Sequence, residues 1–378
     1  MKGQKLGIGL IGCGNFCKAY LNTLGVKYQN VYFASCSDLY REKAEAVAKQ
    51  YGIPKVCTTE EMLEDKDVDI VLILTTPASH YELSMRALNA GKHVYCEKPM
   101  ALNVEQANDI VALAEKKGLY VGNAPDTFLD GGFQTCRKLI DDGAIGRIIG
   151  CTANFVGPGH ELWHPNPDFY YQEGGGPILD MAPYFITALV SLIGPLEQMC
   201  CYGTRGFDER QIQDHVQKVE VLTHYCGIMK FRNGAVGNIN MSFDEWKSTQ
   251  PRMEIYGTEG VIFAPDPNTL EGSVQLLKAS DFKEEILKLP RFERVKMLYS
   301  PESLKYFKTI DYVIPSNGNE RGRGVSDMAD AIMNGGKARA GADISRHVSE
   351  ALAAFNICAD TCMPYVMQST CERPAPLY

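Results

Sequence analysis

Two segments of the chain carry side chains that can move a proton and hold a hydroxyl group. In the first, residues 91–99, an apolar run ends at Lys98, which a proline follows. In the second, residues 174–184, three glycines lead into a helical pattern that carries Asp180 and, four residues later, Tyr184. This spacing predicts that the carboxylate and the phenol share one helix face. Polar groups that interrupt an apolar helix indicate a site.

Each segment also has a purely structural interpretation. A lysine before a proline, taken alone, is equally consistent with a solvated side chain at a strand end. The helix face with Asp180 and Tyr184 continues with Ala188 and Leu192, so we expect most of this helix to be core.

A glycine-rich turn near the start of the chain predicts a dinucleotide site. The apolar run at residues 6–11 is followed by Gly12 and Gly14, and a helical pattern begins at Asn15 and Phe16. The first glycine permits a tight turn, and the second lets the backbone approach a pyrophosphate at the helix N-terminus. The third small position of this fingerprint holds a cysteine. A strand before the turn and a helix after it are the context that supports the motif.

An acidic residue at the end of the second predicted strand strengthens this interpretation. Asp38 follows the apolar run at residues 31–36, where its carboxylate can accept hydrogen bonds from the adenosine ribose. A carboxylate there repels a 2′-phosphate, so we expect NAD as the cofactor. Arg41 nearby keeps NADP as the alternative.

Further cofactor contacts are expected at the carboxyl edge of the strands, where open α/β sheets bind ligands. These candidates are Thr75, Thr76, Pro77, His80, Glu97, Lys98 and Asn123. His80 is equally consistent with an ordinary residue in the first turn of a helix, and Asn123 with a structural turn.

The loop at residues 157–165 supplies candidate substrate contacts. Trp163 offers an apolar face of the kind that packs against a sugar ring, and His160 and His164 can bond hydroxyl groups. The spacing of the two histidines also suggests zinc, but flanking prolines argue against a regular helix and no third ligand is evident. We expect no metal.

The elements that position these residues fall into two parts. Residues 1–125 alternate short apolar runs with helical patterns, which predicts a doubly wound parallel sheet covered on both faces. The predicted strands are 6–11, 31–35, 70–74, 93–96 and 119–121, and the predicted helices are 41–51, 80–90 and 104–117. Asn103 and Gly118 are the expected caps of the last helix.

Residues 126–378 follow a different pattern, typical of an α+β domain with a large, mostly antiparallel sheet. A helix is expected at 127–142, and strands at 147–156, 218–224, 227–231 and 235–243, with a hairpin turn at 232–234. The charged stretch 280–308 reads as an excursion from the sheet. Helices at 324–334 and 344–363 close the chain, and the last helix could pack back on the first domain.

The bulk composition excludes several classes of protein. A net charge of −8 and no basic run disfavour nucleic-acid binding. No stretch approaches the ~18 apolar residues of a membrane span, and the N-terminus lacks the pattern of a signal peptide. The thirteen cysteines are scattered, which favours free buried thiols in a reducing, cytoplasmic compartment.

The glycine turn, the Thr-Pro turn, Glu97-Lys98-Pro99 and the glycine run before Asp180 and Tyr184, in this order, resemble the Gfo/Idh/MocA family of oxidoreductases. The resemblance covers nearly the whole chain and implies an N-terminal Rossmann domain. It also implies a C-terminal domain whose open sheet builds homodimers or homotetramers. Many members carry His at the position of Tyr184, whereas the glucose–fructose oxidoreductase and dihydrodiol dehydrogenase branches carry Tyr.

By this resemblance Lys98 lies beside the nicotinamide and the reacting hydroxyl, with Asp180 and Tyr184 opposite. Either Tyr184 or Lys98 is then the proton-transfer group, and the Lys98 ammonium is expected to lower the pKa of the Tyr184 phenol. The implied activity is an NAD(P)-dependent dehydrogenase or reductase acting on a sugar, cyclitol or glycoside. A glycoside hydrolase that oxidises its sugar transiently, and a non-catalytic sugar or nucleotide sensor, are the alternatives.

Overall fold

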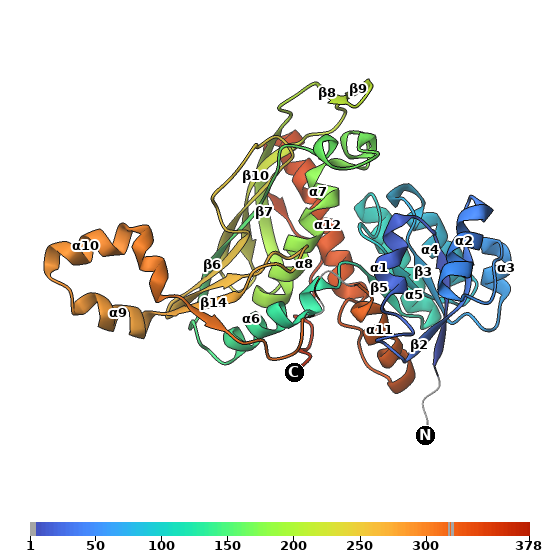
Figure 1. Ribbon diagram of the computed structural model, residues 1–378, viewed down its shortest axis with the longest axis horizontal. Helices are drawn as coiled ribbons and strands as arrows, with labels where there is room; N and C mark the ends of the chain where they lie inside the picture. Colours follow the sequence, from blue (N-terminus) through green and yellow to red (C-terminus); the bar gives the residue numbers. More distant parts are fainter. Residues whose placement is uncertain (1–4, 317, 319–320) are drawn as a thin grey trace.

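The computed structural model describes residues 5–316, 318 and 321–378 and has two lobes (Figure 1). The first is built on a five-stranded parallel sheet in the order β2-β1-β3-β4-β5. Its strands are β1 Leu6–Ile11, β2 Val31–Ser37, β3 Ile70–Ile73, β4 His93–Cys96 and β5 Val121–Asn123. Its helices are α1 Lys18–Leu21, α2 Arg41–Tyr51, α3 Thr59–Glu64, α4 His80–Asn89 and α5 Val104–Lys117.

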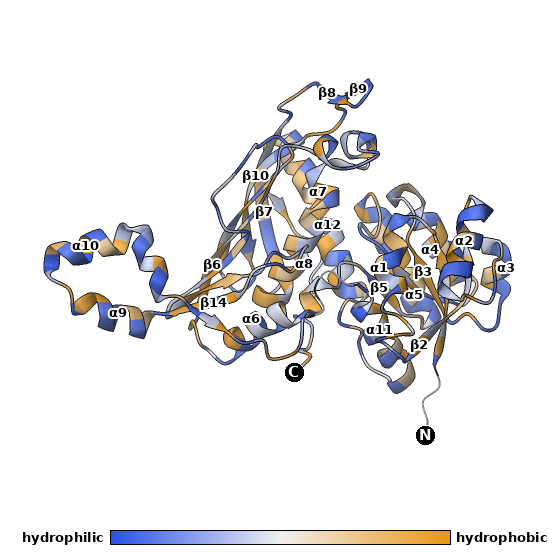
Figure 2. Cartoon of the chain, in the orientation of Figure 1, coloured by the Kyte–Doolittle hydropathy of each residue, from blue (hydrophilic) through white to orange (hydrophobic). Residues whose placement is uncertain are grey.

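These strands are continuously apolar because each of their two faces is buried in a separate core. Leu10 and Leu72 belong to the core on one face, and Ile11 and Ile73 to the core on the other. Figure 2 shows the resulting apolar colour along β3 and its neighbours. The doubly wound parallel sheet is therefore confirmed, and Asn103 and Gly118 cap α5 as predicted.

The second lobe is built on a nine-stranded sheet in the order β15-β14-β13-β12-β6-β11-β10-β7-β16. All its neighbouring strands pair antiparallel except β6 and β11. The strands are β6 Ile148–Val156, β7 Leu196–Thr204, β10 His224–Phe231, β11 Val236–Ser242, β12 Met253–Gly257, β13 Gly260–Ala264, β14 Val274–Lys278, β15 Lys308–Ile310 and β16 Tyr365–Val366. The predicted large, mostly antiparallel sheet and its hairpin at Gly234 are confirmed.

Helices cover one face of this sheet and share its core. They are α6 Gly131–Asp141, α7 Gly176–Asp180, α8 Ala182–Ile193 and α12 Ala342–Thr361. All twelve residues of α8 are buried. The excursion at 280–308 is confirmed as two helices, α9 Ala279–Leu287 and α10 Arg291–Tyr299, which project away from the sheet (Figure 1).

Helix α11, Arg323–Asn334, returns to the first lobe after the second sheet is complete. Val325, Met328 and Ala329 belong to the same core as Leu10 on β1. Helix α12 then lies between the lobes, where it packs on α5 and β5 as well as on α8 and β7.

Apart from β5, which lies two residues later than the strand expected at 119–121, three predicted elements differ from the structure. The predicted strand 218–224 is wrong: β8 Glu209–Ile212 and β9 His215–Lys218 form a separate hairpin. The connecting residues bond to other segments, since Glu220 N–H donates to Tyr171 O and Thr223 N–H to Thr204 O.

The other two differences are helix breaks. The helix expected at 127–142 starts at Gly131, because the Asp130 side chain caps it by accepting from Gly132 N–H at 3.2 Å. The continuous helix expected through Asp180 and Tyr184 is interrupted at Met181. Pro183 lacks the N–H that would continue the hydrogen-bond ladder.

Two further observations concern the chain as a whole. All thirteen cysteines are free thiols and most are buried. Within the described residues, no helix combines the length and the apolar character needed to cross a bilayer.

Candidate active site

The glycine turn after β1 has the geometry that a dinucleotide requires. Gly12 has φ of 100°, and a Cβ there would lie 2.7 Å from the carbonyl of Leu74, so no side chain fits. A Cβ on Gly14 would meet no protein atom within 4 Å. The space above this second glycine is therefore open to a phosphate, while the turn itself is closed against β3.

Asp38 is held beside this turn by backbone hydrogen bonds. Its carboxylate accepts from Cys13 N–H at 2.7 Å and from Tyr40 N–H at 2.9 Å. Each oxygen keeps a further lone pair for a ribose hydroxyl. Asn15 and Phe16 are exposed in a short 3₁₀ turn that leads into α1, so the helix behind the turn is shorter than the fingerprint suggests.

The turn after β3 presents Thr75, Thr76 and Pro77 at the carboxyl edge of the sheet. Thr76 is exposed, and Thr75 and Pro77 are half-buried. His80, expected as a possible contact in this turn, is instead fully buried. Its Nδ1 lies 2.7 Å from Pro99 O and its Nε2 3.1 Å from Thr75 O. The imidazole thus ties this turn to the turn that follows Lys98 and offers no nitrogen to a cofactor.

Glu97 and Asn123 are likewise engaged inside the protein rather than at the predicted cofactor surface. The Glu97 carboxylate accepts from Tyr20 Oη at 2.7 Å and from Lys98 N–H at 2.9 Å. The Asn123 amide donates to Cys96 O at 2.8 Å and to Glu97 O at 3.0 Å. Both side chains therefore hold the strand end that carries Lys98.

Lys98, Asp180 and Tyr184 converge, as predicted, although a helix break separates the last two. Lys98 Nζ donates to Asp180 Oδ1 at 2.7 Å and to Asp180 O at 2.6 Å. The same ammonium lies 5.3 Å from the centre of the Tyr184 ring. The Lys98 and Asp180 side chains are 16% and 13% exposed. Within the described residues, the Tyr184 hydroxyl makes no hydrogen bond to a protein group.

The three groups fix one another's charges. Burial alone would lower the pKa of Lys98, but Asp180 and then Tyr184 raise it well above its usual range. Burial opposes ionisation of Asp180, yet the adjacent Lys98 ammonium holds its pKa well below the usual range. Burial raises the pKa of Tyr184 and outweighs the lowering by Lys98 and Arg321. The expected lowering by Lys98 is present, but the net shift is upward.

His160 joins this cluster from the loop after β6. Its Nε2 lies 3.2 Å from Asp180 Oδ2, and its ring stacks on Tyr170 with 3.8 Å between centres. Its Nδ1 is buried and finds no hydrogen-bond partner in the described chain. Neither nitrogen faces open space, so the predicted direct sugar contact by His160 is not supported by this geometry.

The two other candidates in this loop lie further out. Trp163 is 68% exposed, and its ring centre lies 5.3 Å from that of His160. His164 is half-buried, stands edge-on to Trp163, and accepts from Asn166 N–H at its Nδ1.

Sequence reasoning missed two arginines that support the site. The buried Arg210, from β8, donates to Glu161 Oε1 at 2.8 Å and to Phe243 O at 3.0 Å, which pins the loop of His160 to the end of β11. Arg321, 4% exposed, has its guanidinium 5.8 Å from the Tyr184 ring. Single arginines on short or irregular segments give no periodic signal, so nothing in the pattern could have indicated them.

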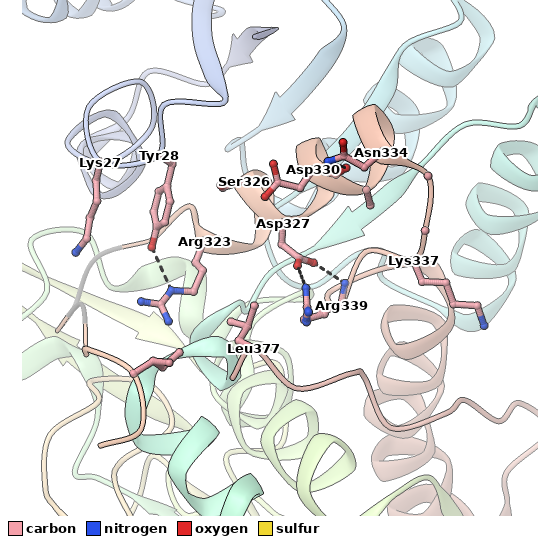
Figure 3. Close-up of a pocket in the computed structure, with 14 residues that line it drawn as sticks. Lys27, Tyr28, Arg323, Ser326, Asp327, Asp330, Asn334, Lys337, Arg339 and Leu377 are labelled. Atoms are coloured by element: carbon pink, nitrogen blue, oxygen red, sulfur yellow. Dashed lines mark hydrogen bonds and ion pairs between the residues drawn. The ribbon is translucent and has the colours of Figure 1, made fainter. Parts of the chain in front are cut away.

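A cavity of about 500 Å³ lies elsewhere in the molecule (Figure 3). Its lining includes Tyr28, Arg323, Asp327 and Arg339, and none of the three converging residues. Its arginines already bind protein groups: Arg339 pairs with Asp327, and Arg323 donates to Tyr28 Oη. The cluster at Lys98 is the better candidate for the active site. Its proton-transfer groups converge, and it lies at the same carboxyl edge of the parallel sheet as the glycine turn.

The first domain has a parallel sheet with a dinucleotide turn and carries Lys98. The second domain brings a carboxylate and a phenol to this lysine. Together these features define a nicotinamide-dependent oxidoreductase. Residues 6–124 match the family described as "Oxidoreductase family, NAD-binding Rossmann fold", and residues 133–263 match "GFO/IDH/MocA C-terminal domain". The chain belongs to the Gfo/Idh/MocA family, its first domain is an NAD-binding Rossmann domain, and it is an oxidoreductase.

Similar proteins act on sugars and cyclitols. The chain is 29% identical to 1,5-anhydro-D-fructose reductase of Ensifer adhaerens over 63% of this chain and 70% of the reductase. It is 25% identical to myo-inositol 2-dehydrogenase of Thermotoga maritima over 68% and 74% of the two chains. The structure of levoglucosan dehydrogenase with NADH and levoglucosan has a TM-score of 0.79 at 22% identity, covering 96% of this chain and 99% of that one.

Proposed function

We propose that the protein transfers a hydride between NAD and a ring carbon of a sugar, cyclitol or glycoside, with Tyr184, Lys98 and Asp180 acting on the substrate oxygen. The observation that carries this proposal is the convergence of three side chains: the Lys98 ammonium lies 5.3 Å from the centre of the Tyr184 ring and donates to Asp180 Oδ1 at 2.7 Å. A buried phenol without a protein partner is available to a substrate oxygen.

The bound nicotinamide supplies or accepts the hydride. Gly12, Gly14 and Asp38 are the residues that would hold the dinucleotide, with the turn at Thr75–Pro77 alongside. The charge of Asp38 supports a preference for NAD over NADP.

The chain's own residues handle the proton. In the reducing direction, Tyr184 donates its proton to the substrate oxygen, which fits its raised pKa. Lys98 stabilises the negative charge that develops on that oxygen, and Asp180 fixes Lys98 and accepts from a neighbouring hydroxyl. In the oxidising direction, ionised Tyr184 takes the hydroxyl proton. A raised pKa argues against Lys98 as the base.

Two substitutions test this assignment. We expect Lys98→Met and Tyr184→Phe to lower turnover by about 100-fold or more, the usual weight of a proton-transfer group, while NADH binding measured by fluorescence persists. Unchanged turnover with intact cofactor binding would remove both residues from the mechanism.

The panel of substrates for this test is hexoses, inositols and their glycosides, followed by nicotinamide absorbance. Net formation of NADH on adding substrate separates a dehydrogenase from a hydrolase that oxidises its sugar only transiently. Absence of any redox change with every class would favour a non-catalytic sensor.

We also propose that the protein forms a homodimer or homotetramer through the open face of the nine-stranded sheet. Tyr202, Ile228 and Val236 on β7, β10 and β11 are 64%, 59% and 50% exposed on that face. Contiguous exposed apolar side chains of this kind mark association surfaces.

A further inference from the structure

Both tryptophans of the chain are exposed, Trp163 by 68% and Trp246 by 72%. Indole side chains are mostly buried in proteins, so an exposed one calls for a ligand or a partner. The two lie on loops that leave the parallel neighbours β6 and β11 at the same end, where Gly157 N–H donates to Ser242 O at 3.0 Å.

Trp163 is in ring contact with the candidate active site. His160 lies between the indole and the carboxylate, 5.3 Å from Trp163 by ring centres and 3.2 Å from Asp180 by its Nε2. Trp246 makes no ring contact with His160. His160 itself is buried, whereas the indole that it contacts is exposed to a ligand.

The loop that presents Trp163 is fixed rather than loose. His160 N–H donates to Tyr171 Oη at 3.0 Å, and Tyr171 in turn donates to Glu161. Glu161 is paired with the buried Arg210 at 2.8 Å. The exposed indole is therefore held in place before a ligand arrives, which lowers the entropic cost of binding.

His164 adds a directed polar group at the edge of this indole. Its ring stands at 85° to Trp163 with 5.3 Å between centres. Because its Nδ1 accepts from Asn166 N–H, the ring proton resides on Nε2, which can donate to a ligand hydroxyl. The apolar face of the indole and the hydrogen-bond donor beside it suit a ligand ring that has an apolar face and a polar edge.

We propose that Trp163 and His164 form a subsite for a second ring, so that the preferred substrate is a glycoside rather than a free monosaccharide. This inference rests on the proposed function: the reacting ring lies at Lys98 and Tyr184, and the aglycone, a pyranose or an aryl ring, stacks on the indole. A monosaccharide held at Lys98 would leave Trp163 uncovered.

The kinetic test compares the phenyl and methyl glycosides of glucose, galactose and mannose. We expect Trp163→Ala to lower the ratio of kcat/KM for the phenyl over the methyl glycoside at least ten-fold, and Trp163→Phe to keep the ratio within about three-fold. Trp246→Ala, equally exposed, is the matched control and should leave the ratio unchanged. An equal loss for both glycosides in Trp163→Ala overturns the subsite.

Fluorescence gives a second readout that needs no turnover. Trp246→Phe leaves Trp163 as the sole tryptophan, whose emission should shift to shorter wavelength when phenyl glycoside is added to the NADH-bound protein. Trp163→Phe, which leaves only Trp246, should show no shift. No shift from Trp163 at saturation, or a change in oligomeric mass in Trp163→Ala, overturns the proposal. If the unsubstituted enzyme oxidises no hexose, inositol or glycoside, the redox function itself fails. If it oxidises hexoses or inositols but no glycoside, or oxidises both kinds of glycoside without dependence on Trp163, only the subsite fails.

Discussion

Lys98, Asp180 and Tyr184 carry fixed protonation states before any ligand binds. The ammonium and the carboxylate stabilise each other, and the buried phenol stays neutral. In the proposed mechanism the resting site is thus prepared to donate a proton from Tyr184, whereas the oxidising direction first requires ionisation of this phenol.

This asymmetry predicts a dependence on pH. Ionised Tyr184 accumulates only as pH rises toward its raised pKa, so we expect kcat/KM for alcohol oxidation to increase with pH above neutrality. Lys98 lowers the pKa of Tyr184, so Lys98→Met should move this rise to higher pH, while Lys98→Arg, which keeps the charge, should move it less. Identical profiles in all three proteins would contradict the role of Tyr184.

His160 belongs to the same network but acts through Asp180. Its Nε2 faces a carboxylate and its Nδ1 has no hydrogen-bond partner among the described residues, so a ring proton on Nε2 directed at Asp180 is favoured. We infer that it is a positioning residue, which holds Oδ2 of Asp180 and leaves Oδ1 to Lys98.

Two variants of His160 separate donation from packing. His160→Phe keeps an aromatic ring against Tyr170 but loses the donor, and we expect kcat to fall about 10-fold or more. His160→Gln keeps an N–H donor and should retain kcat within about three-fold, with the pH profile of the unsubstituted enzyme. The opposite order, with melting temperatures alike, would assign His160 to packing alone.

We expect Asp38 to govern the choice of nucleotide. Asp38→Asn keeps an oxygen for the Cys13 N–H but removes the charge that repels a 2′-phosphate. We expect the ratio of Kd for NADP over NAD, measured by calorimetry, to fall about ten-fold. An unchanged ratio with the same melting temperature would show that another group sets the preference.

At the scale of elements, a buried histidine joins α12 to the start of β7. His347 Nε2 accepts from Leu196 N–H at 2.9 Å, and its Nδ1 lies 2.9 Å from Ser369 Oγ. Burial lowers the pKa of this imidazole to about 4 from an ordinary value of 6.5. The junction between helix and sheet therefore depends on a neutral ring.

This shift makes the fold sensitive to acid. The unfolded imidazole binds a proton near pH 6.5 and the folded one only near pH 4, so the free energy of unfolding falls as pH drops through this window. Between pH 7 and pH 5 the loss from this group is about 2 kcal/mol. Denaturant unfolding of His347→Gln should show a correspondingly weaker loss. The control, His215→Gln, removes an exposed ring whose pKa Asp168 raises, and should not reduce acid sensitivity.

Most elements of the first lobe could be predicted from the sequence, because parallel strands covered on both faces give continuous apolar runs. Helix ends were predictable where a cap was local, as at Asn103 and Gly118. The helix break at Met181 was not predictable, because an apolar helix pattern continues across Pro183. The connecting segment between β9 and β10 was not predictable either, because its residues bond to distant backbone groups.

The site followed the same division. The meeting of Lys98 with Asp180 was predictable from motif order, and the structure brings these groups together. The sequence could not predict whether a polar side chain faces the ligand or the interior, because this depends on tertiary partners. His80 and Glu97 turn inward, to Pro99 O and to Tyr20.

At the scale of the whole molecule, the uncovered face of the nine-stranded sheet bears on assembly. A lysine in place of Ile228 would bring like charges together at a symmetric contact, so we expect Ile228→Lys to shift the protein toward monomer in sedimentation analysis. Phe292→Lys, at a side chain 90% exposed on α10, is the control away from this face. Dissociation by the control alone would place the contact on the excursion instead.

The return of α11 to the first lobe determines the order in which the molecule can be completed during synthesis. Val325, Met328 and Ala329 fill the core around β1, yet they leave the ribosome long after the strands they cover. The nucleotide-binding domain is thus the first to be synthesised, but its core is completed only after α11 has been made. A product terminated early, or a gene cut after residue 125, would carry an open apolar surface, and any attempt to transplant this domain into another protein must carry residues 323–334 with it.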